Sequence, residues 1–153
     1  LSSPTMELIR DALVAKVLNQ TKGIHNIVDN VVVGAMSAPN ARKFFRPGSL
    51  MIMPADREDL IETAAAPNET GAPTKLSGVV LTDDIRPSNR VMKIIESMPY
   101  PVLMTPEDSY QVASTVHDLI VKTRPGDVAK IALIRDLVKT HVHVSSIVDQ
   151  TIR

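Results

Sequence analysis

Polar side chains follow directly after four short apolar runs of this chain. These polar groups are Ser37, Asp56-Arg57, Thr82-Asp83-Asp84 and Thr105. A guanidinium beside the free backbone N–H groups of a helix start is suited to hold a phosphate or a carboxylate. Aspartate and hydroxyl oxygens are instead the ligands that Mg²⁺ prefers in proteins. The residue types alone leave both chemistries open.

Helix capping is a simpler role for several of these residues. Ser37, Asp56 and Thr105 each precede a helical pattern, and such a side chain can accept a hydrogen bond from an unpaired backbone N–H of the first turn. We expect capping to be the main role of these three residues, with Arg57 as the counter-charge of Asp56. For Asp83-Asp84 a solvated turn and a functional role are equally compatible with the sequence.

Four strand-loop-helix units would position these residues. Apolar runs without polar alternation predict strands that are covered on both faces, at residues 30–36, 49–53, 77–82 and 102–104. Amphipathic patterns predict a helix after each strand, with the starts at Ser37, Asp56, Ser88 and Thr105. The last start is a strong signal, because a hydroxyl cap is followed by Pro106 at the first helical position and then by two acidic residues.

Further elements are expected on both sides of these units. Thr5 would cap a helix to about Asn19, with Gly23 as its stop, and Asp127 would open a last long helix through Val142. Residues 66–74 form a polar surface loop. We divide the chain into an N-terminal helix or linker, residues 1–26, and an α/β domain, residues 27–153.

Strands that alternate with amphipathic helices form a parallel sheet with right-handed crossovers. We therefore predict an α/β fold, a three-layer domain whose mostly parallel sheet of four or five strands is flanked by helices. All four loops that follow a strand then lie along one edge. Ligands bind at this edge in open α/β sheets, near the point where the strand order reverses. The residues of the predicted ligand site are Asp56, Arg57, Thr82, Asp83, Asp84 and Thr105.

The composition excludes several classes of function. The net charge is zero, and the aromatic residues are Phe44, Phe45, Tyr100 and Tyr110, so nucleic acid and anionic membranes are poor partners. The chain has no cysteine, which excludes disulfides and thiolate chemistry. No apolar run approaches the ~20 residues of a membrane helix. The length of 153 residues suits one domain.

Motifs for catalysis or for a cofactor are absent from the sequence. It contains no P-loop, no G-x-G-x-x-G and no G-x-S-x-G, so we expect no catalytic residues and no cofactor. His141 and His143 could form a metal pair if that segment were extended, but no third ligand stands at a useful spacing. We favour surface or core histidines there and predict no metal site.

The segment from Phe45 to Leu50, followed by the segment from Pro54 to Leu60, resembles the DRTGG domain. This domain is best known from the middle of long bacterial phosphate acetyltransferases and from phosphotransacetylase-like proteins with an upstream P-loop domain. Four further segments resemble the family and follow its order: residues 33–36, 78–82, 101–105 and 127–131. The likeness covers about residues 27–142 in all.

The resemblance implies a domain that is not the catalytic one. It implies oligomer assembly, transmission of regulatory signals and, from related pyrophosphatases with CBS modules, adenine-nucleotide binding as a weaker option. The family's Asp-Arg maps onto Asp56-Arg57 and its Thr-Gly-Gly onto Thr82-Asp83-Asp84. Both glycines are aspartates here. Two carboxylates repel an anion, so this version of the site would take phosphate poorly or through a bridging cation.

Three functional hypotheses follow. The first is a non-catalytic regulatory and oligomerisation domain of a phosphotransacetylase-like protein, a homodimer or a higher homo-oligomer. The second is a sensor of a small anionic ligand, a nucleotide or an acyl phosphate. The third is a magnesium-dependent phospho-acceptor domain on Asp56 and Asp83-Asp84, although no lysine follows the fourth strand. We expect a piece of a larger protein, in the cytoplasm or in an organelle stroma.

Overall fold

A computed structural model describes residues 3–19, 22–72 and 74–122 of the chain. Its centre is one five-stranded sheet with the order β1-β5-β4-β3-β2. The strands are β1 (Lys16–Val17), β2 (Asn30–Val33), β3 (Ser49–Pro54), β4 (Gly78–Thr82) and β5 (Val102–Met104). Strands β2 to β5 are parallel, and β1 is antiparallel to β5. The predicted fold class, a mostly parallel α/β domain, is therefore confirmed.

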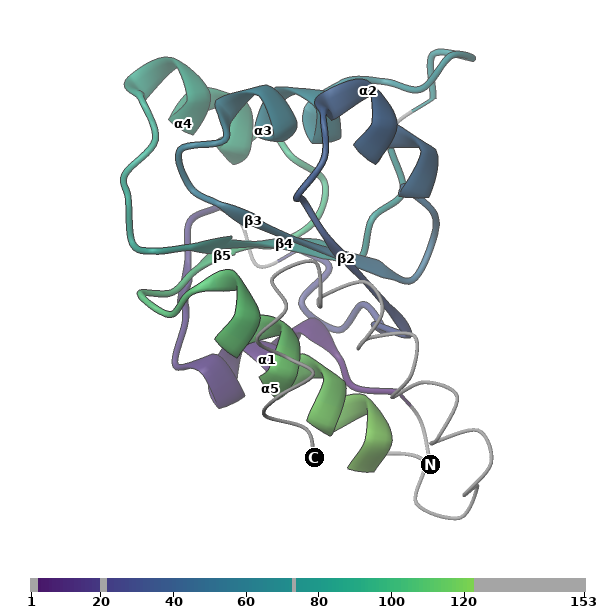
Figure 1. Ribbon diagram of the computed structural model, residues 1–153. Coiled ribbons are helices and arrows are strands. Elements are labelled where there is room, and N and C mark those ends of the chain that lie inside the picture. The colour runs from purple at the N-terminus through teal and green to yellow at the C-terminus, as the bar shows by residue number, and fades with distance from the viewer. Residues whose placement is uncertain (1–2, 20–21, 73, 123–153) are drawn as a thin grey trace.

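Helices cover both faces of the sheet. They are α1 (Met6–Leu13), α2 (Ala38–Ala41) with the short 3₁₀ helix η1 (Arg42–Phe44), α3 (Glu58–Ala65), α4 (Asn89–Glu96) and α5 (Ser109–Lys122). Figure 1 shows α2, α3 and α4 above the sheet and α1 and α5 below it. The domain thus has the three layers expected from the alternation of strands and helices.

The parallel strands follow one another across the sheet without a reversal. Helices α2, α3 and α4 connect β2, β3, β4 and β5 in turn, and right-handed crossovers in one direction place all three helices on the same face (Figure 1). The strand order does not reverse among these four strands, so no crevice of that kind lies between α2, α3 and α4, and the predicted ligand site at the carboxyl edge stays a prediction.

The core lies in two layers, one on each face of the sheet. Residues 49–53 of β3 are fully buried, which explains why this strand shows no polar alternation. On the α1–α5 face, Met6, Ile9 and Leu13 of α1 pack with Leu50, Val80 and the buried face of α5. Gly78 makes room for this layer, since a Cβ atom there would lie 2.3 Å from the Met6 side-chain methyl. Helix α1 docks on the sheet and does not extend away from it.

The N-terminal segment departs from the sequence prediction. Helix α1 ends at Leu13, where Val14 takes a left-handed φ of 50°, and the predicted helix to Asn19 is wrong. The chain then forms β1, whose Lys16 and Val17 pair with Met104 and Leu103. The free edge of β5 can accept this pairing, and two strand residues carry no local pattern that would have revealed it.

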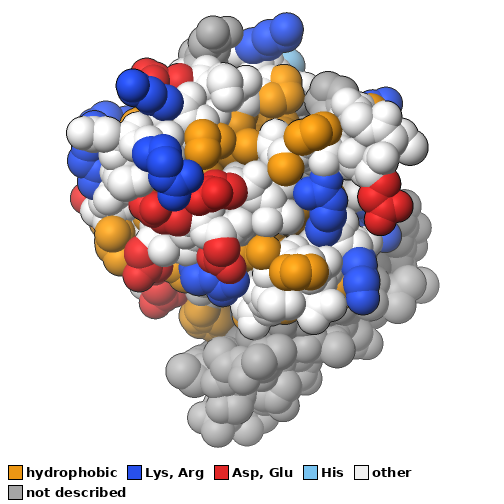
Figure 2. All heavy atoms as spheres, turned by 90° about the horizontal axis from the view of Figure 1, so that it is seen from above, with side chains coloured by type: hydrophobic (Ala, Val, Ile, Leu, Met, Phe, Trp, Pro, Cys, Tyr) orange, Lys and Arg blue, Asp and Glu red, His pale blue; other side chains and the backbone are white. Residues whose placement is uncertain are grey.

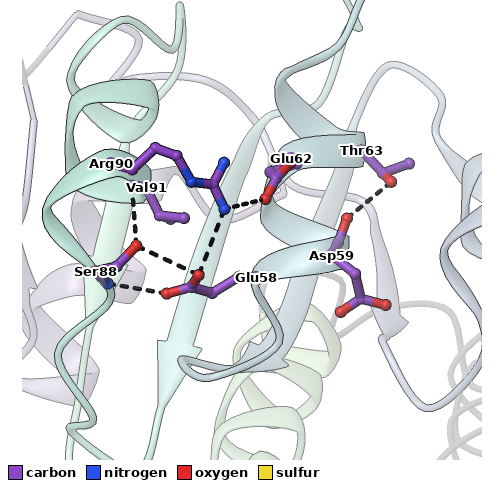
Figure 3. A network of polar contacts seen from close by, with 7 residues as sticks. All are labelled: Glu58, Asp59, Glu62, Thr63, Ser88, Arg90 and Val91. Carbon is purple, nitrogen blue, oxygen red and sulfur yellow. Dashed lines mark hydrogen bonds and ion pairs between the residues drawn. The ribbon is translucent and has the colours of Figure 1, made fainter.

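A polar network joins α3 to α4 (Figure 3). The Glu58 carboxylate accepts hydrogen bonds from the Ser88 backbone N–H at 2.9 Å and the Ser88 hydroxyl at 3.3 Å. The Ser88 hydroxyl in turn accepts from Val91 N–H and caps α4. Arg90 lies 2.8 Å from Glu62 and 3.8 Å from Glu58. Arg90 is well exposed, so its ion pairs add little to the stability of the fold. Their main effect is to orient α3 and α4 relative to each other.

Several predictions concern residues outside the described ranges. These are the helix from Asp127 through Val142 and the pair His141 and His143. Within the described ranges, no helix is long and apolar enough to cross a lipid bilayer.

Candidate functional site

The loops after β3, β4 and β5 meet at the carboxyl edge of the sheet. Ala55 N–H donates to the Thr82 carbonyl at 3.2 Å, and Thr105 N–H donates to the Leu81 carbonyl at 3.0 Å. Thr82 and Thr105 are fully buried, whereas Asp56, Asp83 and Asp84 are exposed. The sequence-predicted residues therefore share one edge, with hydroxyls inside and carboxylates outside.

Arg57 makes four hydrogen bonds to groups of this chain. Its guanidinium makes a bidentate contact with the Asp59 carboxylate, with Nε–Oδ1 and Nη2–Oδ2 distances of 3.0 Å. It also donates to the carbonyls of Met36 at 2.9 Å and Gly34 at 3.4 Å, in the loop after β2. The hydrogen bond to Asp59 raises the pKa of Arg57, and the hydrogen bond from Arg57 lowers the pKa of Asp59. Arg57 ties the start of α3 to the neighbouring loop, and its counter-charge is Asp59 rather than the predicted Asp56.

Asp59→Asn tests this pair through pH. The folded state lowers the pKa of Asp59, so the pair stabilises the fold above the unfolded pKa of about 3.9 and stops doing so as pH falls through the folded value. The Asp59 side chain is 53% exposed, so we expect a loss of less than about 1 kcal/mol in unfolding free energy at pH 7. Urea titrations at several pH values should show the difference shrinking below pH ~4. Asp56→Asn is the matched control, and an equal loss there would contradict the assignment.

The Thr82-Asp83-Asp84 segment has an unusual backbone. Asp83 has φ 68° and Asp84 has φ 50°, both in the left-handed region that favours glycine. The backbone thus explains the two glycines of the DRTGG motif at these positions. Thr82 Oγ1 donates to Asp83 Oδ2 at 2.7 Å and lies 3.4 Å from Ser109 Oγ.

The backbone N–H groups of this segment are already paired. Asp83 N–H donates to the Glu107 carbonyl at 3.0 Å, and Asp84 N–H donates to the Thr105 carbonyl at 3.2 Å. In a phosphate cradle such groups would point at the ligand. Here they join the loop after β4 to the loop after β5, so the segment acts as a connection between loops.

Asp84→Gly is expected to stabilise the domain. A non-glycine residue in the left-handed region costs about 1 kcal/mol, although aspartate tolerates it better than most. Glycine removes that strain but gains freedom in the unfolded chain, so we expect a net gain of about 0.5 kcal/mol in unfolding free energy. Asp83→Gly should gain less, because it also loses the bond from Thr82.

Denaturant unfolding of the two variants measures both changes. Asp84→Ala is the matched control, since alanine keeps the strain and lacks the polar side chain, and it should destabilise the domain. A destabilising Asp84→Gly would show that the carboxylate has a stabilising role of its own.

The predicted caps are only partly correct. Helix α3 begins at Glu58 with Arg57 at the N-cap position, so Asp56 is not a cap. Helix α5 begins at Ser109, so Thr105 is not its cap either; its hydroxyl accepts from Glu107 N–H at 3.3 Å inside the loop. Ser37 does occupy the N-cap position of α2, but its side chain makes no capping bond. Ala55 N–H and Thr105 N–H are bonded to carbonyls of β4, so the chain is still paired with the sheet at these residues. Helices α3 and α5 therefore begin a few residues later than predicted.

The real cap of α5 was missed in the sequence. Asp108 Oδ1 accepts from Gln111 N–H at 2.8 Å, and Gln111 Oε1 accepts from Asp108 N–H at 3.1 Å. This reciprocal pair is a capping box, and an acidic residue followed three positions later by glutamine is its sequence signal. This signal was missed because Thr105-Pro106 is an equally plausible start of the helix.

Metal binding finds no support among residues 3–19, 22–72 and 74–122. No group of three histidine, aspartate or glutamate side chains in these ranges lies close enough to hold a metal ion. Among the described residues of the carboxyl edge, the Arg57 guanidinium and the N–H groups of Asp83 and Asp84 are bonded to groups of the chain itself, and exposed carboxylates lie around them.

The fold and this edge define a small α/β domain with an Asp-Arg loop beside a left-handed Thr-x-x turn. The DRTGG domain family model matches residues 8–119, so the chain belongs to the DRTGG family. The recognition made from the sequence is confirmed.

Curated relatives place this domain within longer proteins. The chain is 29% identical over 150 residues to a phosphate acetyltransferase of Nitratidesulfovibrio vulgaris, covering 96% of this chain and 21% of the relative. It is 34% identical over 113 residues to a phosphate acetyltransferase of Deinococcus radiodurans, covering 72% of this chain and 16% of the relative. The chain thus spans about a fifth of the length of these proteins.

One solved structure shares the fold and sequence similarity. It contains the CBS and DRTGG domains of the regulatory region of Clostridium perfringens pyrophosphatase, complexed with the activator diadenosine tetraphosphate. The TM-score is 0.54 at 26% identity, over 71% of this chain and 44% of that one. In that protein the DRTGG domain belongs to a regulatory region.

Proposed function

We propose that this chain is a non-catalytic regulatory and oligomerisation domain of a phosphotransacetylase-like protein of the cytoplasm. The observation that carries the proposal is the match of residues 8–119 to the DRTGG family, whose structural neighbour lies in a regulatory region. The relatives that align along almost the whole chain are phosphate acetyltransferases, of which it covers about a fifth. In these relatives, the matching segment is one part of a longer protein.

The carboxyl edge supports a non-catalytic role. Arg57 is held by Asp59 and two carbonyls, and the N–H groups of Asp83 and Asp84 are bonded to the next loop. A group that takes part in a reaction must be able to reach a substrate, whereas these groups join the four loops that follow β2, β3, β4 and β5.

Sedimentation velocity over a micromolar concentration range tests the oligomerisation proposal. We expect a dimer or a higher closed oligomer of the 153-residue chain, since homo-oligomers are usually symmetric. A monomer at every concentration would overturn this part of the proposal. An acetyl-transfer assay of the same sample, with a full-length phosphate acetyltransferase as the positive control, should show no turnover; turnover would overturn the non-catalytic part.

A second candidate function is a small-ligand sensor. The observation that favours it is the diadenosine tetraphosphate bound to the neighbour's regulatory region. In this reading Asp56, Arg57, Thr82, Asp83, Asp84 and Thr105 would line the site. A thermal-shift screen with diadenosine tetraphosphate, mononucleotides, acetyl phosphate and Mg²⁺ decides it, because a ligand at a hundred times its dissociation constant adds ~2.7 kcal/mol of stability. A flat screen would remove the sensor role.

A further inference from the structure

A cluster of basic residues lies at the opposite edge of the sheet from the DRTGG motif. Arg42 and Arg46 precede β3, and Lys75 precedes β4, so all three lie near the amino ends of the parallel strands. The three side chains line one cavity of about 170 Å³, together with Phe45, Pro47 and Thr74. We call this cavity and the two that adjoin it the basic groove.

The adjoining cavities extend the groove on both sides. One, of about 430 Å³, shares Pro47, Thr74 and Lys75 with the central cavity. The other, of about 420 Å³, shares Arg42 with it and adds Lys43. Figure 2 looks down on the α2–α4 face and shows Lys and Arg side chains on the side of α2 as well as on the side of α4. The groove therefore has a small basic centre between two roomier ends.

The basic residues of this groove outnumber the neighbouring carboxylates, which are Glu69 in its lining and Asp29 beside Gly48. In the described part of the chain, Glu69 in the outer cavity is the one acidic residue among the linings. The ion pairs of the described residues involve Arg10, His25, Arg57 and Arg90, and none involves Arg46 or Lys75. The chain as a whole has a net charge of zero, so an unpaired basic cluster is a local feature. Positive charges that share one cavity repel each other, and a bound anion would relieve that repulsion.

Part of the groove is held in place before any ligand arrives. The Arg42 guanidinium donates to the carbonyls of Thr63 and Pro67 at the end of α3. The loop that follows is folded around Asn68 Oδ1, which accepts from Thr70 N–H at 3.0 Å and Ala72 N–H at 2.9 Å. A pre-formed site loses less conformational entropy on binding than a flexible one.

We propose that the basic groove binds a phosphate group, either as inorganic phosphate or as part of a phosphomonoester. Arginine and lysine are the residues that bind phosphate most effectively, through charge-assisted hydrogen bonds. The central cavity is smaller than the ~300–1,000 Å³ of sites for drug-sized ligands, which suits a single phosphate group. The adjoining cavities leave room for the remainder of a phosphomonoester. The site is separate from the DRTGG motif and does not depend on the proposed regulatory role.

Phosphate titrations of the ¹⁵N-labelled chain test the proposal. We expect inorganic phosphate to shift the amide resonances of residues 42–46 and 74–75 in a saturable way, and binding to weaken as NaCl is raised. Arg46→Gln and Lys75→Gln should each weaken binding about tenfold, the loss typical of one charge-assisted hydrogen bond. Lys16→Gln removes an equal charge from β1, at the other side of the sheet, and should leave the affinity unchanged.

The remaining arms distinguish the sources of the phosphate and can overturn the proposal. Tighter binding of adenosine monophosphate than of inorganic phosphate would assign the adjoining cavities to the rest of a phosphomonoester; equal binding would assign the site to phosphate alone. Binding of adenosine as tight as that of its monophosphate would overturn the proposal. So would the absence of shifts at tens of millimolar phosphate, or an equal effect of Lys16→Gln. Arg57→Gln changes the opposite edge of the sheet and should leave the affinity for phosphate unchanged. A loss of affinity in this variant would assign the binding to the sensor site considered above.

Discussion

Replacing Ile9 by aspartate is expected to unfold the domain. Ile9 is fully buried on α1 and packs in the layer between the sheet and α5. The substitution loses about 1.5–3 kcal/mol of apolar burial, and a buried carboxylate without a partner costs several kcal/mol more. Since native domains are stable by only about 5–15 kcal/mol, the sum removes most or all of the stability. Far-UV circular dichroism and a urea titration should show no cooperative native transition.

Two further variants keep this expectation testable. Ile9→Ala should remain folded and lose about 2–5 kcal/mol of unfolding free energy. Leu8→Asp is the matched control, because Leu8 lies next to Ile9 on α1 with 42% of its surface exposed, and it should change stability by about 0.5 kcal/mol or less. If Ile9→Asp unfolded no more easily than Leu8→Asp, α1 would not contribute to the core.

The result bears on where the domain begins. We predicted a boundary between residues 26 and 27, which stays a prediction. Helix α1 fills one layer of the core, and Met6 lies against Gly78 at the start of β4. A chain that begins at residue 27 would expose that layer. We expect it to behave like the Ile9→Asp variant, and a stable truncated chain would support the predicted boundary.

The fold was predictable because its central strands are covered on both faces. Runs such as 49–53 and 77–82 contain apolar residues without alternation, and only a parallel sheet between two helical layers buries them fully. Strand β1 was not predictable, since Lys16 and Val17 become a strand only by pairing with β5. The switch to β1 requires Val14 in a left-handed conformation, for which its side chain gives no signal.

The candidate site was predictable in its location but not in its bonding. Sequence places Asp56, Thr82 and Thr105 at one edge, because each follows a parallel strand. It does not reveal that Arg57 reaches the carbonyls of the loop after β2, since that contact spans 21 residues of sequence and depends on strand pairing. The positive φ of Asp83 and Asp84 is likewise a tertiary property that the family's glycines reflect and the aspartates conceal.

Asn19→Ala is expected to destabilise the domain by about 2–4 kcal/mol. The Asn19 carboxamide makes three hydrogen bonds across a long sequence separation: its Nδ2 donates to the carbonyls of Ile95 at 3.1 Å and Tyr100 at 2.9 Å, and its Oδ1 accepts from Val102 N–H at 2.9 Å. Val102 is buried, so the loss leaves a backbone N–H without a partner, at about 1–3 kcal/mol. The two carbonyls lose donors as well.

The position of these bonds explains why one surface-proximal residue should matter so much. Asn19 follows β1, and Leu18 N–H already donates to the Val102 carbonyl at 2.9 Å, so its side chain continues the pairing of β1 with β5 beyond the last backbone bond. It thereby fastens the N-terminal segment to the turn between α4 and β5. Asn89→Ala is the matched control, because it removes the same amide from the exposed start of α4. Urea unfolding should show a small effect there, and an Asn19→Ala loss no larger than that of Asn89→Ala would show that β1 holds its place without the side chain.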